Sequence, residues 1–403
     1  MSYEVRRATP EDFPAALHPI FHYFGRLPDA EWVERVSSLL PLERIHAVFD
    51  NGAVVGSASA FPFEIGIPGG FARAAGVTMV GVLPTHRRRG IFNTVMRAQL
   101  EDIHEQGESI AYLWASDDAL YGRFGYGIAS LSGNIEISRD RAAFHGQFEP
   151  RGRLRLVEVD EAVAPFSEIQ RRVAAEHPGM FVRTEEWWRN RRLTDPEESR
   201  DGGGEMVRAL LELDGRPAAY ALYRLNFSAD RGVPRGFTSV VEAMGDSDEA
   251  TREIWRYLLD IDWMERVRAG LLPLDHELFL LLQEPRRLSF NLRDGLWVRL
   301  VDVETALAAR SYKPGEAVVL QLADELCPWN DGAWEIGPDG VARTTRPAEI
   351  SLNASALGSA YLGGFGFGQL ARAGRVEQLV DGALERADAL FRADRYPWCP
   401  EIF

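Results

Sequence analysis

A run of three arginines and a glycine carries the clearest chemical signal in the chain. Arg87, Arg88, Arg89 and Gly90 follow a predicted strand at residues 76–82 and open a predicted helix. The free N–H groups and positive dipole end of a helix N-terminus attract a pyrophosphate, and arginines add charge-assisted hydrogen bonds. The turn has neither a Walker ending nor dinucleotide-type glycine spacing. We predict a phosphate-binding turn; the alternative is a solvated, arginine-rich turn.

A second signal lies where the next predicted strand, residues 110–114, ends. Ser116 follows that strand, Tyr121 falls on the first turn of a short predicted helix, and Tyr126 lies just beyond it. Phenol and thiol pKa values lie within about two units of each other, so Tyr121 can donate a proton to a departing thiolate. The alternative is that Tyr121 and Tyr126 are half-buried aromatic residues at a domain joint.

The elements around both signals predict a mixed α/β first domain over residues 1–150. Their order is strand, helix, hairpin, strand, helix, strand and helix, and the hairpin turns at Asn51-Gly52. Apolar residues at helical spacing after Gly90 draw one stripe, which is typical of a helix packed on a sheet.

Residues 151–290 repeat this order loosely, with a strand at 237–244 and a helix at 248–268. The turn between them carries Asp246, Asp248 and Glu249 in place of arginines. Acidic side chains repel a pyrophosphate. We therefore predict a second, related domain that lacks the cofactor turn.

Residues 291–403 form the third predicted domain, which begins with a strand at 297–301 and a helix at 303–309. Its last residues are rich in proline and aromatic residues, which excludes a helix but favours a packed tail. Desolvation among Trp398, Ile402 and Phe403 would raise the pKa of the terminal carboxylate above its ordinary value of about 3.5. The alternative is a disordered terminus.

Composition limits the class of protein. The chain has 403 residues, 46% hydrophobic and 26% charged, which excludes collagen-like and wholly disordered chains and predicts two or three domains. A net charge of −15 disfavours nucleic acid and membrane partners and favours cationic ones. Cys327 and Cys399 suit a reducing cytoplasm, no histidine spacing predicts a metal site, and no signal peptide or membrane span is predicted.

Together the two signals resemble the GNAT superfamily of acyl-CoA-dependent N-acetyltransferases. Residues 87–92 are similar to its R/Q-x-x-G-x-G/A turn, although Phe92 replaces a small residue, and residues 121–126 are similar to its tyrosine–glycine–aromatic element. Residues 84–90 and 121–127 resemble the corresponding segments of one branch, the Eis family. Segments 219–224 and 294–299 and the terminal phenylalanine extend that resemblance over nearly the whole chain.

The resemblance implies an α/β (α+β) chain of two tandem GNAT-like domains and a sterol-carrier-protein-like domain. It also implies a cytoplasmic homohexamer that acetylates several amines of an aminoglycoside, or lysine side chains, with acetyl-CoA as co-substrate and no metal. Tyr121 takes the general-acid position and the Phe403 carboxylate the general-base position. The implied acetyl-CoA contacts are Val80, Gly81, Val82, Arg87, Arg88, Arg89, Gly90, Ile91, Phe92, Asn93, Ser116 and Asp117.

The substrate and a second function stay open at this stage. The acidic balance suits an aminoglycoside, a polyamine or a lysine-rich peptide, and Glu31, Trp32 and Glu34 are candidates for the substrate wall. The alternative function is a non-enzymatic lipid or small-molecule carrier, with residues 363–368 lining an apolar slot of the third domain. The other explanation for that segment is that it packs a domain interface or fixes the tail.

Overall fold

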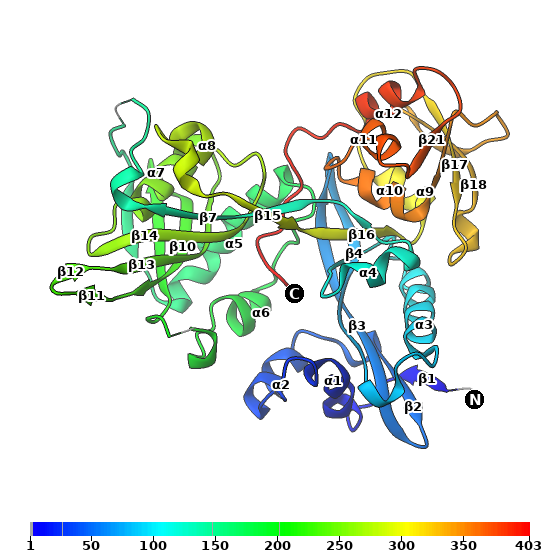
Figure 1. Ribbon diagram of the computed structural model, residues 1–403, viewed down its shortest axis with the longest axis horizontal. Coiled ribbons are helices and arrows are strands. Elements are labelled where there is room, and N and C mark those ends of the chain that lie inside the picture. The colour runs from blue at the N-terminus through cyan, green and yellow to red at the C-terminus, as the bar shows by residue number, and fades with distance from the viewer. Residues whose placement is uncertain (1–2, 26, 147, 201) are drawn as a thin grey trace. The chain divides into compact units, whose positions relative to one another are not determined.

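The computed structural model describes residues 3–25, 27–146, 148–200 and 202–403, which divide into two compact units (Figure 1). Unit 1 contains Met1–Ser130, Leu296–Pro397 and Ile402–Phe403. Unit 2 contains Leu131–Gly295 and Trp398–Glu401. Each unit has its own seven-stranded mixed sheet, and unit 1 has a further sheet of five strands.

The seven-stranded sheet of unit 1 has the order β1-β2-β3-β4-β5-β16-β6. The predicted hairpin joins β2 to β3, and its turn residues Asn51 and Gly52 both have positive φ angles, 51° and 81°. The strands are β1 (Glu4–Arg7), β2 (Ile45–Asp50), β3 (Ala53–Ile67), β4 (Gly70–Val82), β5 (Ile110–Trp114), β6 (Gly127–Ile128) and β16 (Leu296–Leu300).

Two strands pair with strands from outside the domains to which the predicted boundaries assign them. Strand β16 pairs with β5 and β6 in the first sheet, although its residues were assigned to the third domain. Strand β7 (Leu131–Ser138), assigned to the first domain, pairs with strands of unit 2. The chain therefore passes from unit 1 to unit 2 after Ser130, well before residue 150. This boundary was not predicted, because the residue pattern of a strand does not show which strand it pairs with.

Helix α3, which follows the arginine turn, packs on the first sheet and fixes the position of that turn. Five of the six residues of its predicted apolar stripe are buried, and Phe92 is partly exposed. The five, each at most 2% exposed, are Ile91, Val95, Met96, Leu100 and Ile103. The helices of this part are α1 (Phe13–Phe21), α2 (Ala30–Ser37), α3 (Ile91–Glu105) and α4 (Asp118–Tyr121). α3 packs on β2, β3 and β4, so its first residues lie beside the outer end of β4.

The C-terminal part of unit 1 is a five-stranded sheet, β19-β18-β17-β20-β21, with four helices. The predicted helix at residues 303–309 is confirmed as α9. The elements are α9 (Val303–Ala309), β17 (Val318–Ala323), β18 (Gly332–Gly337), β19 (Gly340–Arg343), β20 (Ile350–Asn353), α10 (Ala354–Tyr361), α11 (Phe367–Arg372), β21 (Val376–Gln378) and α12 (Ala383–Phe391).

Unit 2 is built around the sheet β15-β7-β14-β13-β10-β9-β8. The helix predicted at 248–268 is wrong beyond Leu259, where α7 ends; Met264 begins strand β14 and happens to continue the helical spacing of apolar residues. The remaining elements are β8 (Arg153–Leu156), α5 (Val159–Glu176), α6 (Glu185–Trp187), β9 (Val207–Leu213), β10 (Arg216–Asn226), β11 (Ala229–Asp230), β12 (Val233–Pro234), β13 (Gly236–Gly245), α7 (Asp248–Leu259), β14 (Met264–Leu272), α8 (Leu278–Leu281) and β15 (Asn291–Asp294).

A buried ionic cluster crosses the core of unit 2. Arg183 donates to both carboxylate oxygens of Glu242 (2.7 and 2.6 Å) and to Glu401 (2.8 Å), and Arg192 lies 2.7 Å from Glu242. Burial by itself would raise the pKa of Glu242, but Arg183 and Arg192 outweigh it and lower this pKa to about 2. The carboxylate is therefore ionised in the folded chain.

We expect Glu242→Ala to lower the free energy of unfolding by about 3–5 kcal/mol, because Arg183 and Arg192 would stay buried without their carboxylate. Since the folded pKa lies below the ordinary value, the contribution of Glu242 is present above about pH 4.5 and is lost as the pH falls toward 2. Denaturant unfolding at neutral and acidic pH measures both effects. The control is Glu136→Ala, which breaks half-exposed pairs of the same sheet and should cost less than about 1 kcal/mol. Equal losses for the two variants would contradict the expectation.

Candidate active site

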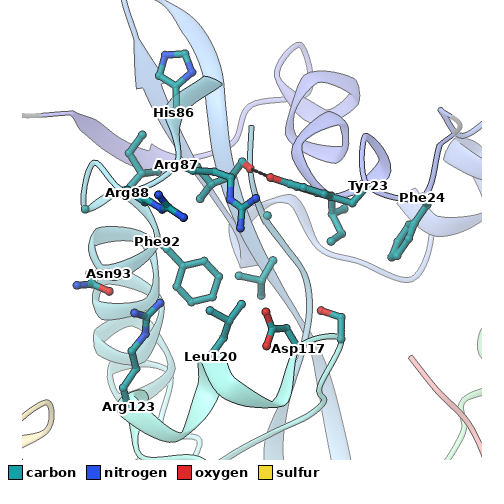
Figure 2. Close-up of a pocket in the computed structure, with 17 residues that line it drawn as sticks. Tyr23, Phe24, His86, Arg87, Arg88, Phe92, Asn93, Asp117, Leu120 and Arg123 are labelled. Atoms are coloured by element: carbon teal, nitrogen blue, oxygen red, sulfur yellow. Dashed lines mark hydrogen bonds between the residues drawn. The ribbon is translucent and has the colours of Figure 1, made fainter. Parts of the chain in front are cut away.

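A pocket of about 770 Å³ in unit 1 lies where β4 ends and where α3 and α4 begin (Figure 2). One wall comes from α1 and the residues after it, a second from the turn before α3, and a third from the segment after β5. The lining residues are Ile20, Tyr23, Phe24, Val80, Gly81, Val82, His86, Arg87, Arg88, Gly90, Ile91, Phe92, Asn93, Ser116, Asp117, Leu120 and Arg123.

Strand β4 is bulged and splayed at the pocket. Between its paired positions Thr78 and Gly81 it has one residue more than β3, and Met79 in this segment has a φ of 52°. The parallel pairing of β4 with β5 ends at Gly76. Beyond that point the two strands diverge, so residues 80–82 line the pocket on the side that β5 leaves open, while Gly81 and Val82 still pair with β3.

The turn before α3 has the geometry of an anion site. Gly90 is the N-cap with a φ of 86°, and it has no side chain to satisfy the first N–H groups of the helix. Arg88 also has a positive φ, 61°. Arg87 and Arg88 line the pocket together with the first residues of α3, whereas Arg89 does not.

The pocket is basic although the chain is acidic. Three arginines and one histidine line it, against a single aspartate, Asp117, while the chain has a net charge of −15. Arg123 reaches the pocket from the side opposite the arginine turn, with its guanidinium carbon 5.6 Å from the centre of the Phe92 ring (Figure 2). Positive groups from two walls suit a ligand with several phosphates.

The structure brings nearly all predicted cofactor contacts together. Every one of them lines the pocket except Arg89. Four lining residues of note were not predicted from the sequence: Tyr23, Phe24, Leu120 and Arg123. The Tyr23 hydroxyl donates to the Val82 carbonyl (2.8 Å), which closes one end of the pocket. Arg123 lies within the tyrosine motif and was therefore readable; Tyr23 and Phe24 carry no sequence signal beyond their aromatic rings.

Tyr121 lies behind the lining, at the end of α4. It follows the pocket residues Ser116 and Asp117, is 4% exposed, and packs against Phe92 with ring centroids 6.2 Å apart. Burial raises the pKa of Tyr121 to about 12, and a hydrogen bond with Ser116 opposes part of this rise. The phenol therefore holds its proton at neutral pH, as a general acid requires.

The C-terminal residue is packed beside the bulge of β4. The Phe403 ring contacts Tyr112 and Phe63, with centroids 4.8 and 5.2 Å apart. The Thr78 hydroxyl donates to an oxygen of the terminal carboxylate (3.1 Å). Thr78 directly precedes Met79, so this carboxylate lies beside the strand that also lines the pocket.

The residues that precede Ile402, Trp398–Glu401, belong to unit 2. The Trp398 N–H donates to the Pro178 carbonyl (2.8 Å), and Glu401 is held by the buried ionic cluster. Ile402 is 48% exposed and thus contributes little to desolvation. The rings that pack on Phe403, Phe63 and Tyr112, come from the first sheet, whereas the expected desolvation was among Trp398, Ile402 and Phe403 itself.

The matching turn of unit 2 is closed by its own side chains. Ser247 caps α7 by accepting a hydrogen bond from the Ala250 N–H (3.3 Å). Asp246 is buried between Arg172 and Arg216. The Ser247 cap satisfies one of the first N–H groups of α7, and the two arginines beside the turn are paired with Asp246, so this turn suits a pyrophosphate less than the turn before α3 does.

The remaining candidates lie outside the pocket. Trp32, on α2, packs against Phe21 with centroids 4.8 Å apart, and Glu31 pairs with Arg35. Neither these two residues nor Glu34 is among the pocket-lining residues. Within the described ranges, no three or more His, Cys, Asp or Glu side chains gather as a metal site. None of the helices described there has the length and apolar character needed to cross a bilayer.

The sheet, the bulged strand and the basic turn define a GNAT-type acetyltransferase. Family models of an acetyltransferase (GNAT) domain match residues 4–129 and 179–300, and a sterol carrier protein domain matches residues 303–400. Unit 1 thus holds a GNAT domain and the sterol-carrier-like domain, and the second GNAT match falls mostly in unit 2.

Relatives cover the chain from end to end. An uncharacterized N-acetyltransferase of Streptomyces avermitilis is 37% identical over the full length of both chains. The N-acetyltransferase Eis of Mycobacterium tuberculosis is 34% identical over 89% of each chain. The crystal structure of Eis1 from Mycobacterium abscessus superposes with a TM-score of 0.87 at 34% identity, covering 99% of this chain and all of that one. The chain belongs to the Eis family of GNAT N-acetyltransferases.

Proposed function

We propose that the chain transfers the acetyl group of acetyl-CoA directly to amines of a polycationic substrate. The observation that carries this proposal is the basic pocket formed by the arginine turn and the bulged β4. GNAT acetyltransferases use acetyl-CoA, and the pocket fits that co-substrate: an uncapped helix end and arginines suit a pyrophosphate, and a splayed strand suits an extended amide chain.

The arginines of the turn provide the first test. We expect Arg88→Ala to weaken acetyl-CoA binding about tenfold or more, because a charge-assisted contact to phosphate is lost. Arg89→Ala is the matched control, since Arg89 has the same charge and lies next in the chain but does not line the pocket. Calorimetric titration of both variants measures the difference, which should shrink as salt is added. Equal weakening in the two variants would contradict the assigned turn geometry.

The reaction uses one general acid, the Tyr121 phenol, and one general base, the Phe403 carboxylate. The amine lone pair attacks the acetyl carbonyl carbon, the carbon–sulfur bond breaks, and the thiolate takes the proton of the Tyr121 hydroxyl. The proton lost by the amine goes to the Phe403 carboxylate, which Thr78 holds beside β4. Backbone N–H groups of residues 80–82 polarise the thioester carbonyl. Neither Cys327 nor Cys399 lines the pocket, which favours direct transfer over an acyl-enzyme.

The substrate class follows from charge. The chain carries 60 acidic against 45 basic side chains, and the terminal carboxylate adds a negative charge at the reaction centre. We expect kcat/KM to be higher for a multi-amine aminoglycoside than for a singly charged amine and to fall as ionic strength rises. Acetylation of a lysine peptide or a polyamine with equal efficiency would shift the assignment to those substrates. Each reaction is monitored by the release of CoA thiol and by the mass of the product.

The homohexamer implied by the family resemblance is part of the same proposal, and sedimentation of the purified chain tests it.

The carrier alternative depends on the glycine-rich segment at residues 363–368. In the structure Phe367 is fully buried against Phe391 (centroids 4.9 Å), and Asp388 accepts hydrogen bonds from the Phe367 and Gly368 N–H groups. These contacts support the interpretation that the segment is packed, and they disfavour an open slot.

A further inference from the structure

Helix α10, in the sterol-carrier-like part of unit 1, packs with its backbone directly on the first sheet. A Cβ atom on Gly127 would overlap the Ser355 carbonyl, and one on Gly358 would overlap the Val298 carbonyl. Only glycine permits such an approach of β6 and β16 to the helix. Tyr126, the last residue of the tyrosine turn (residues 121–126), immediately precedes β6, so the helix is seated next to this turn.

A chain of hydrogen bonds runs from this part of the chain to Tyr121. Arg375 donates to the Ser355 hydroxyl oxygen (2.6 Å), and the Ser355 hydroxyl donates to the Tyr126 carbonyl (2.8 Å). Because a guanidinium can only donate, Ser355 must accept from Arg375, which directs its own hydrogen toward Tyr126. The Tyr126 N–H in turn donates to the Tyr121 carbonyl (3.4 Å).

A buried ion pair supports the same turn. Arg299, on β16, donates to both oxygens of Asp324 (2.6 and 2.7 Å). Its guanidinium lies against Gly125, where a Cβ atom would overlap it. Asp324 also accepts from the Cys327 N–H (3.1 Å) and the Asn330 side chain (3.0 Å), which fix its position. The turn that carries Tyr121 is therefore bounded by groups from the last third of the chain.

We infer that Ser355 is a positioning residue for Tyr121, and that the sterol-carrier-like part of the chain serves acetyl transfer by holding the tyrosine turn. This inference rests on the proposed function, because it requires Tyr121 to supply the proton to the leaving thiolate. Ser355 is 4% exposed and touches neither the pocket nor the reacting atoms. It acts only through the Tyr126 carbonyl and the backbone that leads to Tyr121.

The first test compares two serines one helical turn apart. Ser359 is also buried, but its hydroxyl donates to the Ser355 carbonyl (3.2 Å) instead of to the tyrosine turn. We expect Ser355→Ala to lower kcat about tenfold with an unchanged KM for acetyl-CoA, because a small displacement of a reacting group costs rate but not ground-state binding. Ser359→Ala should change kcat less than about twofold. Ser355→Thr, which keeps the hydroxyl, should restore most of the activity.

The second test is a double-mutant cycle with Tyr121→Phe. If Ser355 acts through Tyr121, Ser355→Ala lowers kcat no further once the phenol is gone. Additive losses, or a Ser355→Ala effect equal to that of Ser359→Ala, would overturn the inference while leaving the proposed function intact. An unchanged kcat for Tyr121→Phe alone would overturn the proposed acid and the inference together. Arg375→Gln, at a half-exposed position, repeats the cycle if Ser355→Ala fails to fold: a fall in kcat only when Tyr121 is present supports the inference, and any other pattern overturns it.

Discussion

Tyr121→Phe lowers kcat by about 10²–10³-fold and leaves the dissociation constant of acetyl-CoA unchanged, because it removes only the proton given to the leaving thiolate. The expected control is Tyr126→Phe. Among the described residues the buried Tyr126 hydroxyl has no hydrogen-bond partner, so its removal breaks no bond there and should leave both kcat and stability nearly unchanged. Steady-state kinetics and equilibrium binding of the two variants separate chemistry from binding. Equal activities of the two variants would remove Tyr121 from the mechanism.

The same residue sets an expectation for the pH dependence. A general acid works below its pKa, and burial raises that of Tyr121 to about 12. The activity of the unmodified chain should therefore not decline near pH 10, where an ordinary phenol ionises. A descending limb centred near pH 10 that disappears in Tyr121→Phe would show that the phenol is not protected by burial as described.

Adding one glycine after Phe403 should lower kcat about 10²-fold. The terminal carboxylate would move by about 3.5 Å along the chain, and an amide, which cannot accept the proton, would take its place beside Thr78. Acetyl-CoA binding should be unaffected, because Phe403 does not line the pocket.

The matched control for the extended tail is Ile402→Val. It changes a half-exposed side chain of the same tail and leaves the carboxylate of Phe403 in place, so activity should be kept. Kinetics with saturating acetyl-CoA compare the two variants. Full activity of the extended chain would exclude the terminal carboxylate as the base.

Local features of the site could be predicted from the sequence. The helix that begins at Ile91, its buried stripe and the basic turn before it depend on residues next to one another, and they are found where expected. The tyrosine motif is similarly local, and Tyr121 lies directly behind the pocket lining. Charge at the turn of residues 245–249 was readable as well, since it needs no knowledge of partners.

Features that depend on distant partners could not be predicted. Thr78 meets the carboxylate of a residue 325 positions away, and no pattern in either segment signals this contact. Strand β16 joins the first sheet because of which strands are adjacent in space, which alternation does not encode. The bulge at Met79 places a non-glycine residue at positive φ, which sequence rules disfavour. The support of the tyrosine turn by α10 became visible only once the backbones were seen in contact.

A single-turnover measurement distinguishes direct acetyl transfer at the basic pocket from transfer through an acyl-enzyme. Enzyme in excess is mixed with acetyl-CoA and a multi-amine aminoglycoside, and the released thiol, the product mass and the mass of the chain are recorded together. For direct transfer we expect one acetylated amine for each thiol released, with the mass of the chain unchanged at every time. An acetylated form of the chain, or thiol released without an acetylated amine, would contradict it.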